Sequence, residues 1–174
     1  MRWWLAAALL VLLGCEEKVR PTVVPLSTAG IPSQESWRST VIFSDSARVK
    51  AVLWAGYIAM YAEQEYTVLQ DSIHVDFFDE SGERSSTLTA RRGRVNDRTR
   101  DFEAYENVVV VSNDGTSLTT DRLFWNNVER KIHTDAYVEI VTQKEEIRGN
   151  GLVSDQSLKN YRIFRVTGRA VTDE

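Results

Sequence analysis

Short apolar runs separated by turn-forming residues are the feature that most limits how this chain folds. From about Thr40 onward, runs rich in Val, Ile, Thr, Tyr and Phe alternate with clusters of Asp, Asn and Gly at 79–82, 96–97, 113–115 and 126–127. β-branched and aromatic residues suit the half-buried surface of a strand, and such clusters end strands. The clearest strand covers 107–112. The pattern therefore predicts an all-β domain.

A weak internal repeat of about 30 residues supports this interpretation. The sequence LTA at 88–90 recurs as LTT at 118–120, and loosely as IRG at 147–149. With the same offset, Val95 aligns with Trp125. Each unit has the size of a hairpin, which must stack on its neighbours to bury its apolar face. The alternative is a chance similarity between hairpins.

Segment 49–62 fits two kinds of secondary structure. Val49, Ala51, Leu53 and Ala55 alternate as in a strand, whereas the content of Ala, Leu and Met also suits a helix. We expect a strand, because everything that follows has β character.

The N-terminus has the pattern of a lipoprotein signal. Arg2 precedes the apolar segment 3–13, which is shorter than the roughly 20 residues that a membrane span needs. The segment ends in LLGC at 12–15, so we expect cleavage after residue 14 and lipidation of Cys15, the only cysteine in the sequence. The alternative is an ordinary signal peptide followed by a free thiol.

Three divisions of the chain follow from this pattern. Residues 1–14 are the predicted signal peptide. Residues 15–36 contain all three prolines of the sequence and are predicted to form an extended tether after the lipidated cysteine. Residues 37–174 are the predicted β domain.

Composition excludes several functions. The formal net charge of −4 argues against a nucleic-acid-binding protein. With Cys15 lipidated, no thiol remains for catalysis or metal binding. His74 and His133 lack the spacing of a metal motif, and no pair of carboxylates is spaced for acid–base catalysis. We therefore expect no enzyme, no metal and no cofactor.

Alternation selects a row of side chains that should point inward from the three repeat units. In the simplest interpretation they fill a closed β-sandwich core. The row comprises Leu88, Ala90, Val95, Phe102, Ala104, Val108, Val110, Leu118, Leu123, Trp125, Ile132, Val138, Ile140, Ile147, Leu152, Tyr161 and Ile163.

Several segments resemble the LptC family of lipopolysaccharide-export proteins. They are STLTA at 86–90, ENVVV at 106–110, TSLTTD at 116–121 and IRGNGLVSD at 147–155, together with EY at 65–66 and VDFFD at 75–79. The resemblance covers roughly 40–172. It implies a twisted, open β-jelly-roll, built from two antiparallel sheets of stacked hairpin layers. Many members have a membrane-spanning helix, whereas the LLGC motif is similar to the lipoprotein-anchored branch.

The resemblance also implies a function. Members of the family lie at the periplasmic face of the inner membrane, receive lipopolysaccharide from an ABC transporter and pass it to a soluble LptA-like carrier of the same fold. On this basis the inward row would line a slot, open along one side, that accepts the acyl chains of lipopolysaccharide. We expect the membrane contact to be made through the lipid anchor.

An open sheet leaves unpaired strand edges, which invite pairing with another chain. The run 161–166 lies near the C-terminus and would form a terminal layer. We expect this edge, with Tyr161, Ile163, Phe164 and Val166, to accept a strand of the soluble carrier by β-augmentation. The opposite end, at 37–43, would face the transporter.

Two other functions are compatible with the sequence. A lipoprotein that binds carbohydrate or another protein would have a closed core and exposed aromatic side chains on one outer face. A hydrolase built on a β-sandwich would need a clustered catalytic pair.

Overall fold

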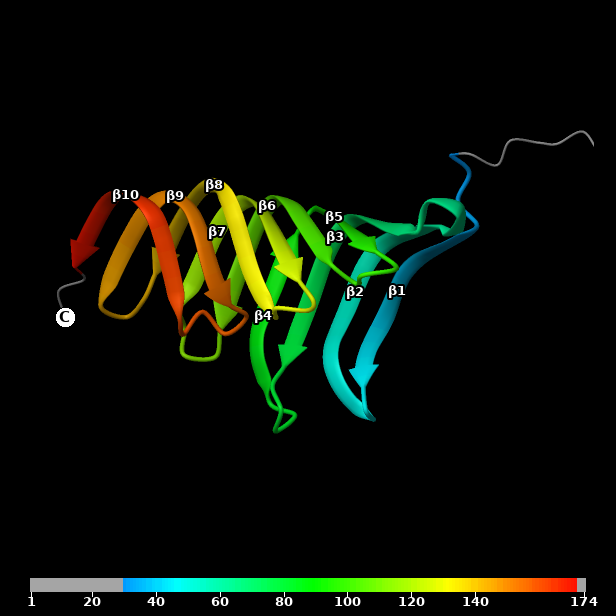
Figure 1. Cartoon of the computed structure of the whole chain (residues 1–174), viewed down its shortest axis with the longest axis horizontal. Helices are drawn as coiled ribbons and strands as arrows, with labels where there is room; N and C mark the ends of the chain where they lie inside the picture. Colours follow the sequence, from blue (N-terminus) through cyan, green and yellow to red (C-terminus); the bar gives the residue numbers. More distant parts are fainter. Residues whose placement is uncertain (1–29, 172–174) are drawn as a thin grey trace, which may run out of the picture.

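The computed structural model describes residues 30–171, and most of them belong to one antiparallel β-sheet of ten strands (Figure 1). The predicted signal peptide, Cys15 and most of the tether lie outside the described residues. The strands are β1 (Gln34–Asp45), β2 (Arg48–Tyr61), β3 (Tyr66–Phe78), β4 (Arg84–Ala90), β5 (Arg92–Asn96), β6 (Phe102–Ser112), β7 (Ser117–Asn126), β8 (Lys131–Val141), β9 (Glu145–Asp155) and β10 (Tyr161–Val171), and a single 3-10 turn, η2 (Ala62–Gln64), follows β2.

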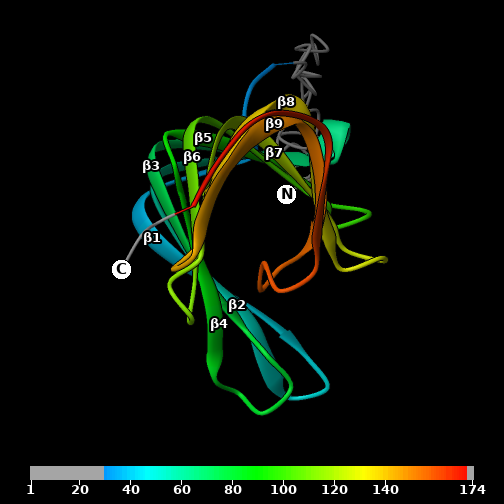
Figure 2. The ribbon, with the colours of Figure 1, turned by 90° about the vertical axis from the view of Figure 1, so that its left-hand side faces the viewer.

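The strands follow one another in chain order across the sheet. Strands β4 and β5 share one position between β3 and β6, because β4 pairs with one half of each neighbour and β5 with the other half. The all-β fold class is thus confirmed. The two layers expected as separate sheets are the two halves of one hydrogen-bonded sheet, which arches over so that the two halves face each other (Figure 2).

A line of irregularities crosses the sheet and creates the arch. Bulges and left-handed residues bend a strand and increase its twist. Here they lie opposite one another on successive strands, so their bends add up to one crease from edge to edge. The interrupted positions are residues 38, 56, 71–72, 91, 106–107, 121, 135–136, 151 and 164.

Gly56 shows why the crease depends on the sequence. A Cβ atom at this position would lie 2.2 Å from the carbonyl oxygen of Asp71, on the neighbouring strand. Both Asp71 and Ser72 have positive φ, so β3 bulges directly against β2 at this point. Only glycine leaves room for such a close approach of two backbones.

Other local expectations are also confirmed. Segment 49–62 is a strand for most of its length, as β2. The turn at 79–82 is closed by the N–H of Gly82, which donates to the carbonyl of Asp79 at 3.2 Å. The run 147–155 lies in β9, where Gly151 has a φ of 81° and lies opposite residues 135–136 of β8.

The hydrophobic core lies inside the arch and extends along its whole length. It contains side chains from β2 to β9 that alternate with exposed ones, as expected for a sheet with one solvated face. The N-terminal strands contribute Leu53, Ala55, Ile58, Leu69, Ile73, Val75 and Phe77, which lie outside the repeat from which the inward row was predicted.

Candidate functional site

An apolar pocket of about 470 Å³ opens between the two halves of the sheet, near the β1–β3 end. Ligand pockets in proteins are typically of this order, at roughly 300–1,000 Å³. The wall of this pocket contains residues from both sides of the crease. On one side are Phe43, Ala51, Leu53, Val75, Phe77 and Phe78 of β1–β3, and on the other side are Val95, Phe102 and Trp125 of β5–β7.

Two aromatic side chains from opposite halves meet in this wall. The ring centroids of Phe77 and Trp125 are 5.7 Å apart, with the planes tilted by 36°. Phe43, Ala51 and Trp125 pack against the core but are only partly buried, because one side of each faces the pocket. The pocket therefore presents apolar surface that is accessible from outside the protein.

Charged side chains also line the pocket. The lining contains three basic residues, Lys50, Arg100 and Arg130, and four acidic residues, Asp45, Asp79, Glu80 and Asp155. Arg130, in the β7–β8 turn, pairs with Glu80 of the β3–β4 turn at 3.4 Å, so this ion pair joins the two halves of the sheet at the pocket. Both side chains are exposed, and such pairs contribute little stability.

Most residues of the predicted inward row do point into the arch, but only Val95, Phe102 and Trp125 line the pocket. Tyr161 and Ile163 are partly buried against the core, and Ile147 is half-buried. The others pack as core: Leu88, Ala90, Ala104, Val108, Val110, Leu118, Leu123, Ile132, Val138, Ile140 and Leu152.

The pocket residues of β1, β2 and β3 were missed by the sequence analysis. The inward row was taken from the repeat, which begins at residue 88, so the first three strands were not searched. The signal was present nevertheless. Ala51 and Leu53 belong to the alternating segment, and Val75 and Phe77 alternate within VDFFD at 75–79.

Both ends of the sheet are strand edges within residues 30–171. β1 and β10 each pair with one neighbour, β2 and β9 respectively. On β10, Tyr161 and Ile163 point inward, whereas Phe164 and Val166 are 55% and 57% exposed. On β1, Trp37 is 64% exposed. The residues predicted for docking thus lie on a free edge at the C-terminal end.

Aromatic side chains also cluster on the outer face near the β1 edge. Trp37 and Tyr57 have ring centroids 5.7 Å apart, and Tyr61 stacks on Tyr66 at 4.8 Å. The hydroxyl of Tyr57 hydrogen-bonds to the carboxylate of Glu35, which raises the pKa of Tyr57 to about 12.

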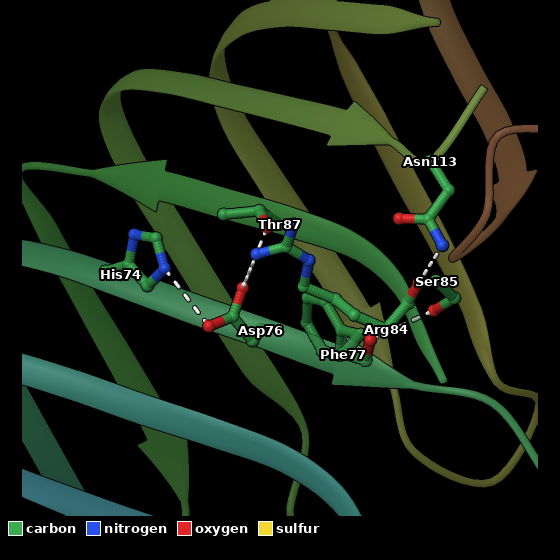
Figure 3. A network of polar contacts seen from close by, with 7 residues as sticks. All are labelled: His74, Asp76, Phe77, Arg84, Ser85, Thr87 and Asn113. Carbon is green, nitrogen blue, oxygen red and sulfur yellow. Dashed lines mark hydrogen bonds and ion pairs between the residues drawn. The ribbon is translucent and has the colours of Figure 1, made fainter. Parts of the chain in front are cut away.

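A polar network on the outer face of β3 and β4 is centred on Asp76 (Figure 3). Its carboxylate accepts a hydrogen bond from the hydroxyl of Thr87 at 2.8 Å, and lies 3.3 Å from His74 and 3.5 Å from Arg84. Burial acts to raise the pKa of Asp76, but Thr87, His74 and Arg84 together lower it. These contacts tie neighbouring strands together and lie outside the pocket.

Within the described part of the chain, no group of three or more His, Cys, Asp or Glu residues could hold a metal ion. His74 and His133 are exposed and lie on different strands; His133 stacks on Phe124 with centroids 5.2 Å apart. Among residues 30–171 there is also no helix with the length and apolar character of a membrane span.

Residues 30–171 thus form an open β-jelly-roll with an apolar interior and a strand edge at each end of the sheet. The family model for lipopolysaccharide-assembly, LptC-related proteins matches residues 5–169. The chain therefore belongs to the LptC family, as the resemblance indicated. No curated protein matches the sequence.

Membership in this family establishes the general role of the chain. The LptC family is a transport family rather than a family of enzymes, and its members are periplasmic and associated with the inner membrane. They bind lipopolysaccharide and work with the Lpt transporter and with LptA. The chain thus has a role in lipopolysaccharide transport.

Proposed function

We propose that the chain is a lipid-anchored periplasmic component of lipopolysaccharide export. It accepts lipopolysaccharide from the inner-membrane ABC transporter in the pocket and passes it to the soluble LptA-like carrier. The main support is the pocket itself, because its aromatic and aliphatic wall is reachable from outside and charged residues are also part of its lining. An amphiphile fits this arrangement, with its acyl chains inside and its phosphorylated sugars at the entrance.

Transfer of the acyl chains from water supplies the driving force for binding. Each methylene that leaves water contributes about 0.8 kcal/mol, or about 25 cal/mol per Å² of apolar surface. The protein needs no catalytic group for this task. Directional movement is driven by ATP hydrolysis in the transporter, and the pocket acts as a passive intermediate site.

Photo-cross-linking in cells tests the position of the lipid. A photoreactive amino acid at Phe102 or Trp125, both in the pocket wall, is expected to capture lipopolysaccharide. The same amino acid at Arg98, whose side chain is exposed in the turn after β5, serves as the control and is expected to give no product. Capture at Arg98 without capture at the two pocket positions would refute the proposal.

The free edge of β10 is proposed to bind the carrier by β-augmentation. A strand of the carrier would pair with β10 and extend the apolar interior across the junction. Replacement of Ile163 and Val166 by proline removes two backbone donors from β10 and is expected to abolish carrier binding. Ile42→Pro, on the opposite edge, is the matched control and should leave binding unchanged. Binding retained by the β10 variant would refute this docking site.

Cys15 is the proposed attachment point of the anchor. Two or more acyl chains are needed for stable attachment, because one chain binds membranes only weakly. In cells fed a labelled fatty acid, the chain should become labelled, whereas Cys15→Ser should remain unlabelled and should no longer fractionate with membranes. Membrane association retained by Cys15→Ser would refute the anchor.

The aromatic cluster on the outer face favours a second function, the binding of carbohydrate or another protein. Exposed Trp and Tyr side chains combine large apolar surfaces with polar groups, as at many interfaces. Trp37→Ala with Tyr57→Ala should weaken binding to isolated oligosaccharide if this face is used. Capture of lipid at Trp125 would be unaffected, so the two functions can be tested separately.

A further inference from the structure

The loop between β9 and β10, residues 156–160, spans the two halves of the sheet at one side of the pocket. Gln156 is part of the pocket lining. Its side-chain amide donates to the hydroxyl of Ser85 at 3.3 Å and to the carbonyl of Phe78 at 3.5 Å, both in the half of the sheet opposite the loop. In Figure 2 the loop (orange) turns from one leg of the arch towards the other.

Leu158 anchors the tip of this loop in the core. Its side chain is only 2% exposed and belongs to the same hydrophobic cluster as the residues inside the arch. Its φ of 57° places it in the left-handed region, which bulky residues adopt only under strain. Backbone strain of this kind is typical of functional sites, where burial of the side chain holds the unfavourable conformation.

The rest of the loop is held together from within. The carboxylate of Asp155 accepts hydrogen bonds from the backbone N–H groups of Ser157, Lys159 and Asn160, at 3.0, 3.1 and 3.1 Å. It also accepts from the side chains of Ser157 and Asn160, both at 2.8 Å. The loop is therefore a compact unit, attached to the opposite half of the sheet through Gln156 and Leu158.

Gln156 of this loop and the adjacent Asp155 are among the residues that line the pocket. On the β1–β3 side, Phe43, Ala51 and Trp125 are left partly exposed to the pocket. Further along the sheet, towards β10, Leu118, Val138, Ile140 and Leu152 of the strands are fully buried, and Leu158 of the loop is buried in the same core cluster. The loop, with Leu158 buried in the core, thus connects the pocket, which Gln156 lines, to β10, which follows the loop in the chain.

We infer that residues 156–160 form a gate, which moves as a unit and withdraws Leu158 to open the interior between the pocket and the β10 edge. The inference rests on the proposed function, since it assumes that lipid enters the pocket and leaves at β10. The amide contacts of Gln156, at 3.3 and 3.5 Å, are long and therefore weak. Acyl chains that take the place of Leu158 compensate for the apolar contacts that its side chain loses.

A reversible lock on the gate tests this inference in the full chain. Ser85→Cys and Gln156→Cys are joined by a short bismaleimide that contains a reducible bond. A photoreactive amino acid is placed either at Trp125, in the pocket, or at Ile163, on β10. Compared with the same double-cysteine variant before cross-linking, we expect the locked protein to show unchanged capture of lipopolysaccharide at Trp125 and no capture at Ile163. Reduction of the cross-link should restore capture at Ile163.

A second locked pair is the matched control. Arg122 and Asp135 form an exposed ion pair at 2.8 Å between β7 and β8, far from the loop in sequence. Cross-linking of Arg122→Cys and Asp135→Cys should change capture at neither position. Each single-cysteine variant, treated with the same reagent, controls for reaction at Cys15.

The outcomes separate the gate from the proposed function. Capture at Ile163 that persists in the locked protein would overturn the gate. The gate would also be overturned if the unlocked protein captured lipopolysaccharide at Trp125 but not at Ile163. No capture at Trp125 in any form would overturn the proposed function and the gate with it. Leu158→Gly, which removes the anchoring side chain and relieves the backbone strain, should increase capture at Ile163. No increase would also contradict the gate.

Discussion

Gly149→Ala is expected to loosen β10, the strand proposed to dock the carrier. Gly149 lies in β9 and pairs with Val166 of β10. An added Cβ atom would lie 2.5 Å from the carbonyl oxygen of Arg165 and 2.5 Å from the Cγ2 atom of Ile163. Ordinary contacts are longer than 3.0 Å, and the backbone oxygen cannot rotate away, so β10 itself must move.

The size of the effect follows from this overlap. Overpacking of a well-packed interior destabilises a protein by about 1–3 kcal/mol. For a domain of this size, 1 kcal/mol lowers the melting temperature by roughly 2–4 °C. We therefore expect Gly149→Ala to melt about 4–8 °C below the natural protein, for a loss of about 2 kcal/mol. Amide hydrogen exchange should show that β10 loses protection before the other strands.

Gly168→Ala, in β10, is the matched control in the same pair of strands. The nearest atom to its added Cβ would be the Cβ of Arg148, at 3.9 Å, which is an ordinary contact. Because alanine loses less conformational entropy than glycine, this variant should melt at the same temperature or slightly higher. Equal melting temperatures for Gly149→Ala and Gly168→Ala would refute the argument.

Three further predictions concern the loop and the outer face. Leu158→Ala should lower the free energy of unfolding, measured in urea, by about 2–5 kcal/mol, as for other buried leucines; a change below 1 kcal/mol would show that Leu158 is not anchored in the core. Burial acts to raise the pKa of Asp155, but hydrogen bonds from Asn160, Ser157 and the backbone lower it below its ordinary value. The contribution of Asp155 to stability is therefore present above the pKa of about 3.9 in the unfolded chain, and it is lost as the pH falls through the lower pKa of the folded protein. Unfolding curves below pH 4 should therefore depend less on pH in Asp155→Asn, and an equal dependence would contradict this. Glu35→Gln should bring the pKa of Tyr57 down from about 12 towards the ordinary value near 10, as measured by ultraviolet titration; an unchanged pKa would show that Glu35 is not its cause.

The fold was predictable to the level of strands and turns, because alternation and turn residues are local signals. Segment 107–112 and the turns at 79–82 and 113–115 lie where the sequence placed them. The crease was not predictable in the same way. It arises from bulges on neighbouring strands that lie opposite one another only after the strands have paired, as at Gly56 and Asp71.

For the candidate site, the sequence predicted which side chains point inward but not where the pocket lies. Alternation identifies which side chains point inward, and it selected Val95, Phe102 and Trp125 correctly as interior residues. It cannot distinguish a filled interior from a pocket, because that depends on how closely the two halves of the sheet approach. Leu158 was missed for a similar reason, since nothing in its loop sequence shows that the side chain folds back into the core.

The chemical nature of the cross-link formed at Trp125 tests the account most directly. After capture in cells, mass spectrometry of the cross-linked peptide identifies which part of the lipopolysaccharide is attached. The account predicts attachment to an acyl chain, because Trp125 lies in the apolar wall beside Phe77. Attachment to the sugar or phosphate portion would contradict the proposal that the pocket holds the hydrocarbon chains.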